Sequence, residues 1–270
     1  MAQPDFQKTP FYFRLSQWID IIKFLLVIIG IIWLIARGTE RMGYNWQWYR
    51  VPRYIFSFED GKLTAGPLID GLMVTFHITG VSMVLTFVFG LVTAFFRLSD
   101  SFMARTLARI YLELIRNTPL LVQLLFLYFV LSPVLDIDRF TSAVLALSLF
   151  EGAYVSEIFR AGIVSVPKGQ WEAAYSLGMN TFHAYQYIIL PQAIRRILPP
   201  LVSQAVSLIK DSALVSTIAI YDLTMQGQAI IAETYLTFEL WFTIAAIYLF
   251  ITVTLSLGIS FMEKRMKLGD

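Results

Sequence analysis

Residues 167–178 read Pro-Lys-Gly-Gln-Trp-Glu-Ala-Ala-Tyr-Ser-Leu-Gly, and residues 188–191 read Ile-Ile-Leu-Pro. This stretch is a polar interruption in a chain of 270 residues that is 57% hydrophobic and only 15% charged. Soluble domains carry about 25% charged residues. Each membrane-spanning segment must satisfy its own backbone hydrogen bonds, and helices achieve this within one segment. We therefore expect an all-α fold, a polytopic bundle of membrane helices.

The stretch itself predicts a short helix over residues 170–177. Trp171, Ala174 and Tyr175 are three to four residues apart, which places them on one side of such a helix. Gly178 can adopt the positive φ that ends a helix, and a second helical segment is expected to run to Pro191. A short peg with an exposed aromatic ring is suited to docking in another protein's groove. An ordinary amphipathic surface helix is the alternative.

Six apolar segments are long enough to cross a membrane. They cover about residues 18–36, 68–96, 107–131, 140–164, 194–220 and 239–262. The first could also be a cleaved signal peptide, but no Ala-x-Ala-like site follows it, so we expect a retained helix. The connection 37–67 is rich in Trp and Tyr, which favours a position at the membrane interface over a ligand platform.

Lys and Arg near the span ends indicate the orientation, because cytoplasmic loops carry an excess of them. With the 167–191 loop inside, both termini are cytoplasmic. The basic residues that then fall inside are Lys8, Arg14, Arg97, Arg105, Arg109, Lys168, Arg195, Arg196, Lys264, Arg265 and Lys267. The connection 37–67 would then lie outside and does not follow this rule, because it contains five basic residues: Arg37, Arg41, Arg50, Arg53 and Lys62. Either this connection is an exception or the first segment does not fully cross.

Polar side chains lie inside several of these spans. In the third span, Pro119 removes a backbone hydrogen bond and bends the helix beside Asn117, Thr118 and Gln123. Polar groups beside a break at membrane depth are tolerated where they face protein or a water-filled path. We interpret this span as one wall of a translocation pathway.

The fourth span contains Glu151 and Glu157, with Gly152, Ala153 and Gly162 as small residues that allow close helix approach. Two carboxylates in a span are costly unless they are paired, protonated or wetted. A structural ion pair and a role in a substrate path remain open for both. In the fifth span, Pro199-Pro200 and Lys210-Asp211 are expected to interrupt the helix, and a polar connection follows over 221–238.

The polar stretch over residues 167–191 resembles the EAA loop of permease subunits in bacterial ABC importers. Its pattern is Glu172-Ala173-Ala174, three residues, Gly178, nine residues, then Ile-x-Leu-Pro. Residues 113–124, 152–163 and 208–216 also resemble the polar-amino-acid branch of this family. The resemblance covers most of residues 68–265. It implies a five-helix permease domain there, with a coupling loop at 167–191. Residues 1–67 would be an addition: a cytoplasmic segment, an extra transmembrane helix and an aromatic periplasmic connection.

The resemblance implies a permease subunit of a binding-protein-dependent amino-acid importer in a bacterial inner membrane. Its expected partners are an ABC ATPase subunit dimer, a second permease chain of the same or a similar kind, a periplasmic amino-acid-binding protein and membrane lipid, with no nucleic acid. The expected coupling residues are Gly169, Gln170, Trp171, Glu172, Ala173, Ala174, Gly178, Leu190 and Pro191. The expected substrate-path residues are Asn117, Thr118, Gln123, Glu151, Glu157, Lys210 and Asp211.

Two positions depart from the family pattern. Asn117 stands where a small residue such as Gly is more common, and Glu151 stands where a small or hydroxyl residue is common. Both lie beside the expected path and could tune which solute passes. The Glu151 carboxylate would favour an ammonium or guanidinium group, or it could pair with Arg116 or Lys210.

We expect no catalysis and no cofactor in this chain itself. It lacks the Gly-x-x-x-x-Gly-Lys-Ser/Thr phosphate cradle, so ATP and Mg are expected on the partner ATPase subunits. With no cysteine and only His77 and His183, we expect no metal site and no embedded enzyme. An ion-driven secondary transporter is a rival, with Glu151, Glu157 and Asp211 as cation sites, but we see no internal repeat.

Overall fold

The computed structural model describes the backbone of residues 11–59 and 62–267, and the side chains of residues 18–38, 43–57, 62 and 64–261. The chain divides into two units, Met1–Gln47 and Trp48–Asp270, which are described separately. Several residues of the orientation argument lie outside the described side chains. They are Lys8, Arg14, Arg41, Lys264, Arg265 and Lys267.

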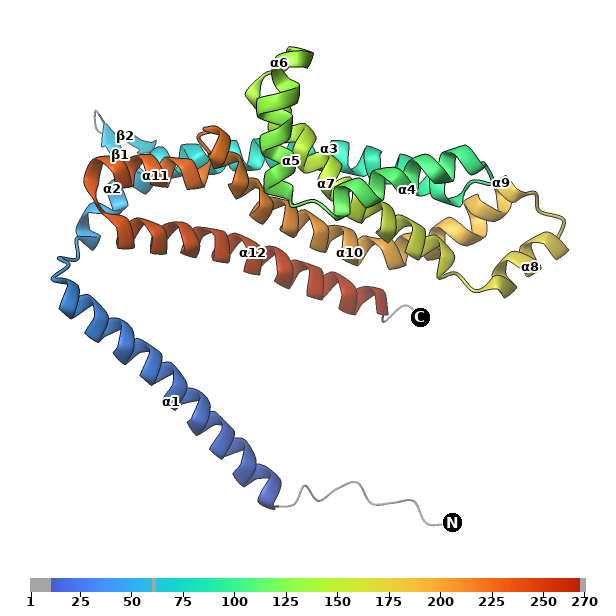
Figure 1. Ribbon diagram of the computed structural model, residues 1–270. Coiled ribbons are helices and arrows are strands. Elements are labelled where there is room, and N and C mark those ends of the chain that lie inside the picture. Colours follow the sequence, from blue (N-terminus) through green and yellow to red (C-terminus); the bar gives the residue numbers. More distant parts are fainter. Residues whose placement is uncertain (1–10, 60–61, 268–270) are drawn as a thin grey trace. The chain divides into compact units, whose positions relative to one another are not determined.

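The first unit contains one helix, α1, over Phe11–Met42 (Figure 1). Its stretch Trp18–Gly38 is long and apolar enough to cross a membrane. Within this unit its large apolar side chains, such as Leu26 and Leu34, are exposed. The sequence prediction of a helix at 18–36 is confirmed. The boundary at residue 67 between the addition and the permease domain stays a prediction.

The second unit begins with a short helical turn, η1 (Trp48–Arg50), and α2 (Pro52–Ile55). A two-stranded antiparallel hairpin follows, β1 (Phe56–Glu59) and β2 (Lys62–Ala65), in which Phe56 pairs with Ala65. The sequence analysis predicted no strands here. The pairing is supported by the Ser57 Oγ–Thr64 Oγ1 hydrogen bond of 2.7 Å across the hairpin.

Three long helices of this unit match the predicted second, fourth and sixth spans. They are α3 (Pro67–Leu98), α7 (Arg139–Val164) and α12 (Thr237–Lys267). In Figure 1 they run side by side with α10 along the long axis of the unit. The packing of α3 on α7 requires small residues: a Cβ on Gly90 would lie 2.5 Å from Val155 Cγ1, and one on Gly152 would lie 2.9 Å from Phe89 Cβ. The expected close approach at Gly152 is therefore confirmed.

The predicted bend of the third span at Pro119 is confirmed, but the helix is broken there and does not run continuously over 107–131. The structure has α4 (Phe102–Arg116) and α5 (Leu120–Phe126), bent by 102° at the break between them. The chain continues through the π-helical turn η2 (Leu127–Leu131) into α6 (Ser132–Leu135). Pro119 causes the break, because it holds an extended conformation (φ −62°, ψ 139°) directly before α5.

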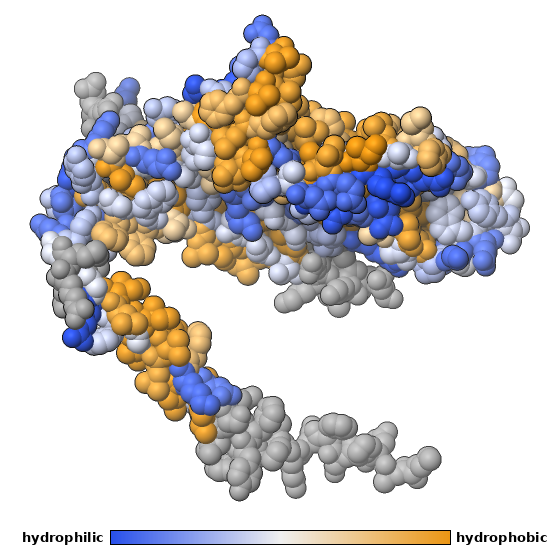
Figure 2. Space-filling view, in the orientation of Figure 1, coloured by the Kyte–Doolittle hydropathy of each residue, from blue (hydrophilic) through white to orange (hydrophobic). Residues whose placement is uncertain are grey.

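The character of α4 explains why it does not continue the span. Its surface combines exposed Leu107 and Leu114 with exposed Arg105 and Arg109, and Figure 2 shows hydrophilic side chains gathered over this helix. Such a helix suits an interface better than a bilayer centre. Within the described residues, five helices are long and apolar enough to span a membrane, or six if the bent pair counts as one span. The expected all-α membrane helix bundle is confirmed.

The fifth span also differs from the prediction. It begins earlier, with α9 (Thr181–His183) and the π-helical segment η3 (Ala184–Ile189), and continues as α10 (Leu190–Asp211). Pro199 and Pro200 lie inside α10 and do not interrupt it. The buried residues Ile197 and Leu201 pack into the same core on both sides of the prolines.

Lys210 and Asp211 do lie where the helix changes. After Asp211 the chain tightens into the 3₁₀ segment η4 (Ser212–Ile218). The predicted polar connection 221–238 contains a further helix, α11 (Leu223–Thr234), which the sequence analysis did not predict. Asp222 begins this helix by accepting a hydrogen bond of 2.8 Å from the Met225 N–H.

Candidate functional site

The polar stretch at one end of the bundle begins with a short helix, α8 (Lys168–Ser176). Gly178 ends it with a φ of +76°. The Gly178 N–H donates to the Tyr175 carbonyl at 2.9 Å, and the Met179 N–H donates to the Ala174 carbonyl at 3.1 Å. These two bonds form a Schellman cap, which fixes the direction of the chain after the helix. The predicted role of Gly178 at the helix end is confirmed.

The inner face of α8 carries two of the three residues that the spacing placed on one side of the helix, Trp171 and Ala174. Ala174 is buried, and the Trp171 ring is half-buried against Tyr185, with ring centroids 4.8 Å apart. Trp171 also packs against the core cluster that contains Ile189 and Ala193. Trp171 therefore fastens the loop to the bundle. The expectation that it lies on one side of α8 with Tyr175 is confirmed, since their ring centroids are 6.3 Å apart, and Tyr175 is the exposed ring of the pair.

The second half of the loop is held by a side-chain cap and then by the bundle. The Asn180 side chain accepts a hydrogen bond of 2.9 Å from the His183 N–H at the start of α9. Helical structure continues through η3 into α10, so it does not end at Pro191. The Gln192 side chain donates to Gln170 Oε1 at 3.1 Å and ties α10 back to α8.

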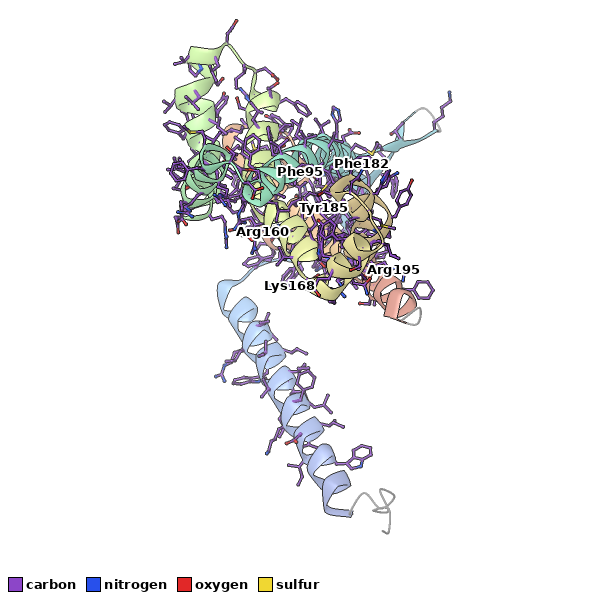
Figure 3. The ribbon with its side chains drawn as sticks, turned by 90° about the vertical axis from the view of Figure 1, so that its right-hand side faces the viewer. Phe95, Arg160, Lys168, Phe182, Tyr185 and Arg195 are labelled. Carbon is purple, nitrogen blue, oxygen red and sulfur yellow. The ribbon has the colours of Figure 1, made fainter. Side chains whose placement is uncertain are left out.

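Four large apolar or aromatic side chains of the loop are more exposed than Leu190, which is 39% exposed. Leu177 is 78% exposed, Phe182 70%, Tyr187 60% and Tyr175 47%. We call these four residues the docking face. Figure 3 looks at this end of the bundle, with Lys168, Phe182 and Tyr185 labelled. Leu177, Phe182 and Tyr187 were not among the expected coupling residues, although their position between the Glu-Ala-Ala and Ile-x-Leu-Pro segments was a usable signal.

Seven of the nine expected coupling residues are exposed. They are Gly169, Gln170, Glu172, Ala173, Gly178, Leu190 and Pro191. The other two, Trp171 and Ala174, are the inward-facing residues described above. The loop is thus a capped projection whose outer surface combines the docking face with polar side chains such as Gln170 and Glu172.

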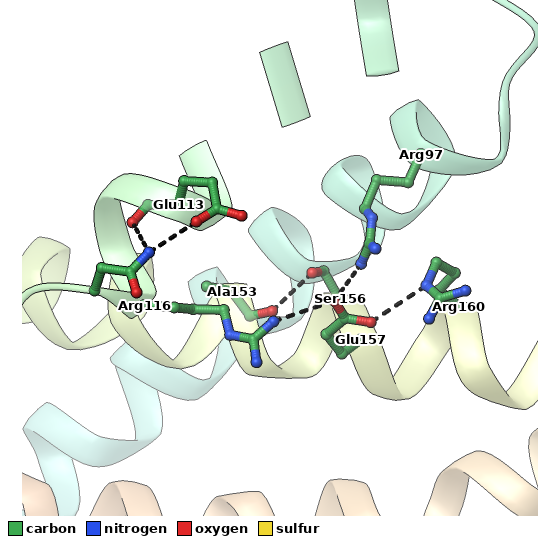
Figure 4. A network of polar contacts seen from close by, with 8 residues as sticks. Arg97, Glu113, Arg116, Ala153, Ser156, Glu157 and Arg160 are labelled. Carbon is green, nitrogen blue, oxygen red and sulfur yellow. Dashed lines mark hydrogen bonds and ion pairs between the residues drawn. The ribbon is translucent and has the colours of Figure 1, made fainter. Parts of the chain in front are cut away.

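Glu157 on α7 is the centre of an ion-pair network (Figure 4). Its carboxylate lies 2.5 Å from Arg97 of α3, 3.3 Å from Arg116 of α4 and 3.2 Å from Arg160 of α7. The Arg116 guanidinium also lies 5.6 Å above the centre of the Tyr154 ring. This network joins three helices at one point. Arg116 therefore pairs with Glu157, and the alternative that it pairs with Glu151 is not what the structure has.

Glu151 is the opposite case, because it is buried without a countercation in contact. Its side chain is 1% exposed in the core between α7 and α10. Gln204 of α10 donates a hydrogen bond to Glu151 Oε2. Glu151 Oε1 has no hydrogen-bond partner among the described residues. Asp211 and Lys210 also interact with this carboxyl.

Gln204 is a residue that sequence analysis missed. It lies seven residues before Asp211, about two helical turns, so the two share a face of α10. A polar residue two turns before a charge in a predicted span was the available signal. The structure thus brings together Glu151, Gln204, Lys210 and Asp211 on α7 and α10.

Asn117, Thr118 and Gln123 form a separate group at the break between α4 and α5. The Asn117 amide donates to the Glu113 carbonyl and to Glu113 Oε2, both at 2.8 Å. The Gln123 amide donates to the Ile115 carbonyl at 2.7 Å and to Thr118 Oγ1 at 2.8 Å. These bonds satisfy the backbone that Pro119 interrupts. Within the described residues, no three His, Asp or Glu side chains are grouped to hold a metal ion.

Comparison with known proteins identifies the family. Residues 86–268 match the family model described as "Binding-protein-dependent transport system inner membrane component". The glutamine transport system permease protein GlnP of Escherichia coli is 40% identical over 204 residues, covering 74% of this chain and 93% of GlnP. The L-cystine transport system permease protein TcyB of Bacillus subtilis is 42% identical over 202 residues, covering 74% of this chain and 86% of TcyB.

Solved structures agree with this result. A chain in a crystal structure of an amino acid ABC transporter with histidines has a TM-score of 0.70 and 42% identity, covering 74% of this chain and 94% of that chain. A chain of the MetNI methionine ABC transporter has a TM-score of 0.64 at 14% identity, over 74% and 96% of the two chains, and shows the shared fold. This chain therefore belongs to the family of binding-protein-dependent transport system inner membrane components, and it is homologous to amino-acid ABC permeases.

Proposed function

We propose that this chain is the permease subunit of an ATP-driven amino-acid importer in a bacterial inner membrane. Two permease chains, identical or similar, form the translocation path at their interface. A periplasmic binding protein delivers the amino acid from outside. Two ATPase subunits bind ATP and Mg inside, and this chain performs no catalysis. The relatives named for glutamine and cystine transport support the substrate class but do not select one amino acid.

The docking face is the observation that carries the coupling proposal. Three of its side chains are 60–78% exposed at the end of a rigid, capped loop. Apolar side chains at this density on a projecting loop favour burial against a partner protein. ATP-driven closure of the partner would then pull on α8 and bias the helix bundle between two arrangements. The loop is cytoplasmic in this proposal, as are both termini.

The group of Glu151, Gln204, Lys210 and Asp211 supports the proposal for the substrate path. A buried carboxylate oxygen without a partner costs free energy, so it suits a site that a ligand, a proton or water occupies for part of a cycle. Such an oxygen can accept a hydrogen bond from an ammonium or guanidinium group of the transported amino acid. Asn117, Thr118 and Gln123 support the bend that forms another part of the path, and Lys210 and Asp211 lie beside the Glu151 site.

The first experiment is to express the chain with its chromosomal neighbours and purify the complex through a tag on this subunit. A co-purifying ATPase whose hydrolysis is stimulated by one class of amino acid, in the presence of the candidate binding protein, is the expected result. A chain that purifies alone and moves solute under an ion gradient without ATP would overturn the proposal.

The coupling step is tested by two variants of the loop. Gly178→Val should uncouple transport from ATP hydrolysis, because a branched residue at a φ of +76° distorts the Schellman cap. Gly178→Asn is the matched control, since Asn tolerates this conformation and should retain more coupling. Glu172→Lys reverses an exposed charge beside the docking face and should also uncouple. Asp100→Lys is its control, an exposed charge reversal outside the loop.

Both loop variants are measured by amino-acid uptake, by stimulated ATP hydrolysis and by the amount of inserted protein. The expected pattern is normal insertion with lost uptake. Wild-type uptake by Gly178→Val and Glu172→Lys at normal expression would contradict the role of the loop in coupling.

A further inference from the structure

The second unit has an apolar groove at the end opposite the docking face. Its cavity of about 820 Å³ is lined by residues of α3 and α12 and by the connection before α3, among them Leu72, Phe76, Phe242, Ala246, Ile251 and Trp48. This volume is within the range of about 300–1,000 Å³ for small-ligand sites. Thr243 is a polar residue in the lining, and its hydroxyl is already bonded to the Glu239 carbonyl at 2.7 Å. The groove therefore suits an apolar occupant.

The dimensions of the groove match one half of a bilayer. On α12 its lining runs from Phe242 to Ile251, which is about 14 Å along a helix axis. The hydrocarbon core of a membrane is about 30 Å thick, so one leaflet contributes about 15 Å. An occupant that fills the groove from its mouth would end near the middle of the membrane, as an acyl chain does.

The mouth of the groove has the residues of a headgroup region. Trp48 lies in the lining with its ring centroid 6.4 Å from that of Phe242, and the neighbouring Tyr49 is 80% exposed. Trp and Tyr of this kind mark the level of the lipid headgroups. Ile55 lines the groove from α2, the same short helix that carries Arg53.

Arg53 is the basic residue of α2, two positions before the lining residue Ile55. Its side chain is exposed, and its guanidinium lies 4.8 Å from the centre of the Tyr54 ring and donates to the Tyr54 hydroxyl at 2.5 Å. A guanidinium has five N–H donors, so this bond leaves others available to a phosphate. Arg53 also belongs to the connection whose basic residues contradict the usual excess of positive charge on the cytoplasmic side. A bound anionic headgroup would explain that departure.

We propose that the groove binds one acyl chain of an anionic phospholipid, with the lipid phosphate at Arg53. The lipid belongs to the leaflet opposite the docking face. It would fasten the connection of residues 48–66 to α3 and α12. The proposal does not depend on the coupling role of the loop, because it concerns the other end of the unit.

The test uses the full chain purified in detergent and exchanged into nanodiscs of phosphatidylglycerol and phosphatidylcholine with the same acyl chains, followed by native mass spectrometry of retained lipid. The wild type should retain phosphatidylglycerol in preference. Arg53→Ala should lower that preference about five-fold, as expected for one basic residue at an anionic headgroup. Lys62→Ala is the charge control, because Lys62 is an exposed residue of the same connection that lies on β2, whereas Arg53 lies on α2 with the lining residue Ile55.

A second pair of variants tests the acyl chain. Ala246→Trp fills the groove and should reduce retention of both lipids, without changing their ratio. Ala245→Trp is the control, since Ala245 is exposed on the same helix outside the lining. Equal retention by Ala246→Trp and Ala245→Trp, or equal headgroup preference in Arg53→Ala and Lys62→Ala, would overturn the proposal. A wild type that retains neither lipid would also overturn it, and a protein helix would then be the occupant to seek.

Discussion

The two carboxylates of α7 lie six residues apart and have opposite surroundings. Glu157 contacts three arginines from three helices and is partly exposed. Glu151 is buried, accepts one amide hydrogen bond from Gln204, and keeps an oxygen without a partner among the described residues. The Glu157 carboxylate is thus paired with several cations, whereas one oxygen of the Glu151 carboxyl lacks a described partner.

This difference distinguishes a carboxylate that joins helices from one that keeps an oxygen without a described partner. A carboxylate surrounded by guanidinium groups has little capacity for a further ligand, and its removal leaves positive charges facing one another. A buried carboxyl with an unpaired oxygen can still bind a ligand. A neutral side chain of the same shape can replace it with a small loss of folding free energy. Glu157 forms the structural ion pair that was one of its two alternatives from the sequence, and its place in the substrate path stays a prediction.

The largest expected effect is that of Glu157→Ala. It leaves Arg97, Arg116 and Arg160 without their shared anion at the point where α3, α4 and α7 meet. We expect a loss of about 2 kcal/mol or more in stability, between the value for exposed pairs and the about 3–5 kcal/mol for buried ones. The measurement is the thermal unfolding midpoint in detergent, with Glu233→Ala, an exposed carboxylate, as control. An unfolding midpoint equal to that of the wild type would contradict the stabilising role of Glu157.

Glu151→Gln should affect transport more than stability. The amide preserves the shape and can still bond with Gln204, but it no longer attracts a cationic group. Loss of a charged hydrogen bond of about 1.5 kcal/mol corresponds to about a ten-fold change in preference between amino acids. Uptake of a panel of amino acids by reconstituted protein measures this. If Glu151→Gln takes up every amino acid at the wild-type rate and with the wild-type affinity, Glu151 has a structural role.

Asp222 sharpens the comparison as a third carboxylate, buried like Glu151 but fully partnered. It caps α11 through the Met225 N–H, and the Tyr248 hydroxyl lies 3.4 Å from its other oxygen. It lies outside the membrane-spanning helices. Burial raises the pKa of Asp222 from 3.8 to about 6, although these hydrogen bonds act to lower it.

The sign of the resulting pH effect follows from that raised pKa. The folded state binds the proton more tightly than the unfolded state, so this contribution to stability is present below about pH 4 and is lost as the pH rises through about 6. The upper limit is about 3 kcal/mol for a shift of about two pKa units. Asp222→Asn keeps a good N-cap and should flatten the stability of the protein between pH 4 and 6 by an amount up to about that limit. A variant with the same pH slope as the wild type would show that other groups cause it.

The loop shows how far residue patterns alone could reach. Its helix, its terminating glycine and its exposed Glu172 follow from local rules of spacing and backbone conformation, and the structure has these features. The partial burial of Trp171 does not follow from those rules. A residue every three to four positions defines a face, but only the neighbour, here Tyr185 on η3, determines whether that face is buried.

Breaks within helices could not be predicted from the positions of prolines alone. Pro119 ends a helix and Pro199-Pro200 do not, although the local rule is the same for each. At Pro119, the polar pair Asn117 and Thr118 and the amphipathic α4 favour leaving the helix. At the second site, buried residues on both sides of the prolines pack into one core and hold the helix together.

The sequence by itself determined the apolar segments, the membrane helix class and the position of the loop, because these depend on composition and on neighbours along the chain. The tertiary structure decided which carboxylate meets the arginines and which remains open. Arg116 lies 41 residues from Glu157, and Gln204 lies 53 residues from Glu151. Such pairs form only when helices pack, and the packing here depends on small residues such as Gly90 and Gly152, whose partners no local pattern specifies.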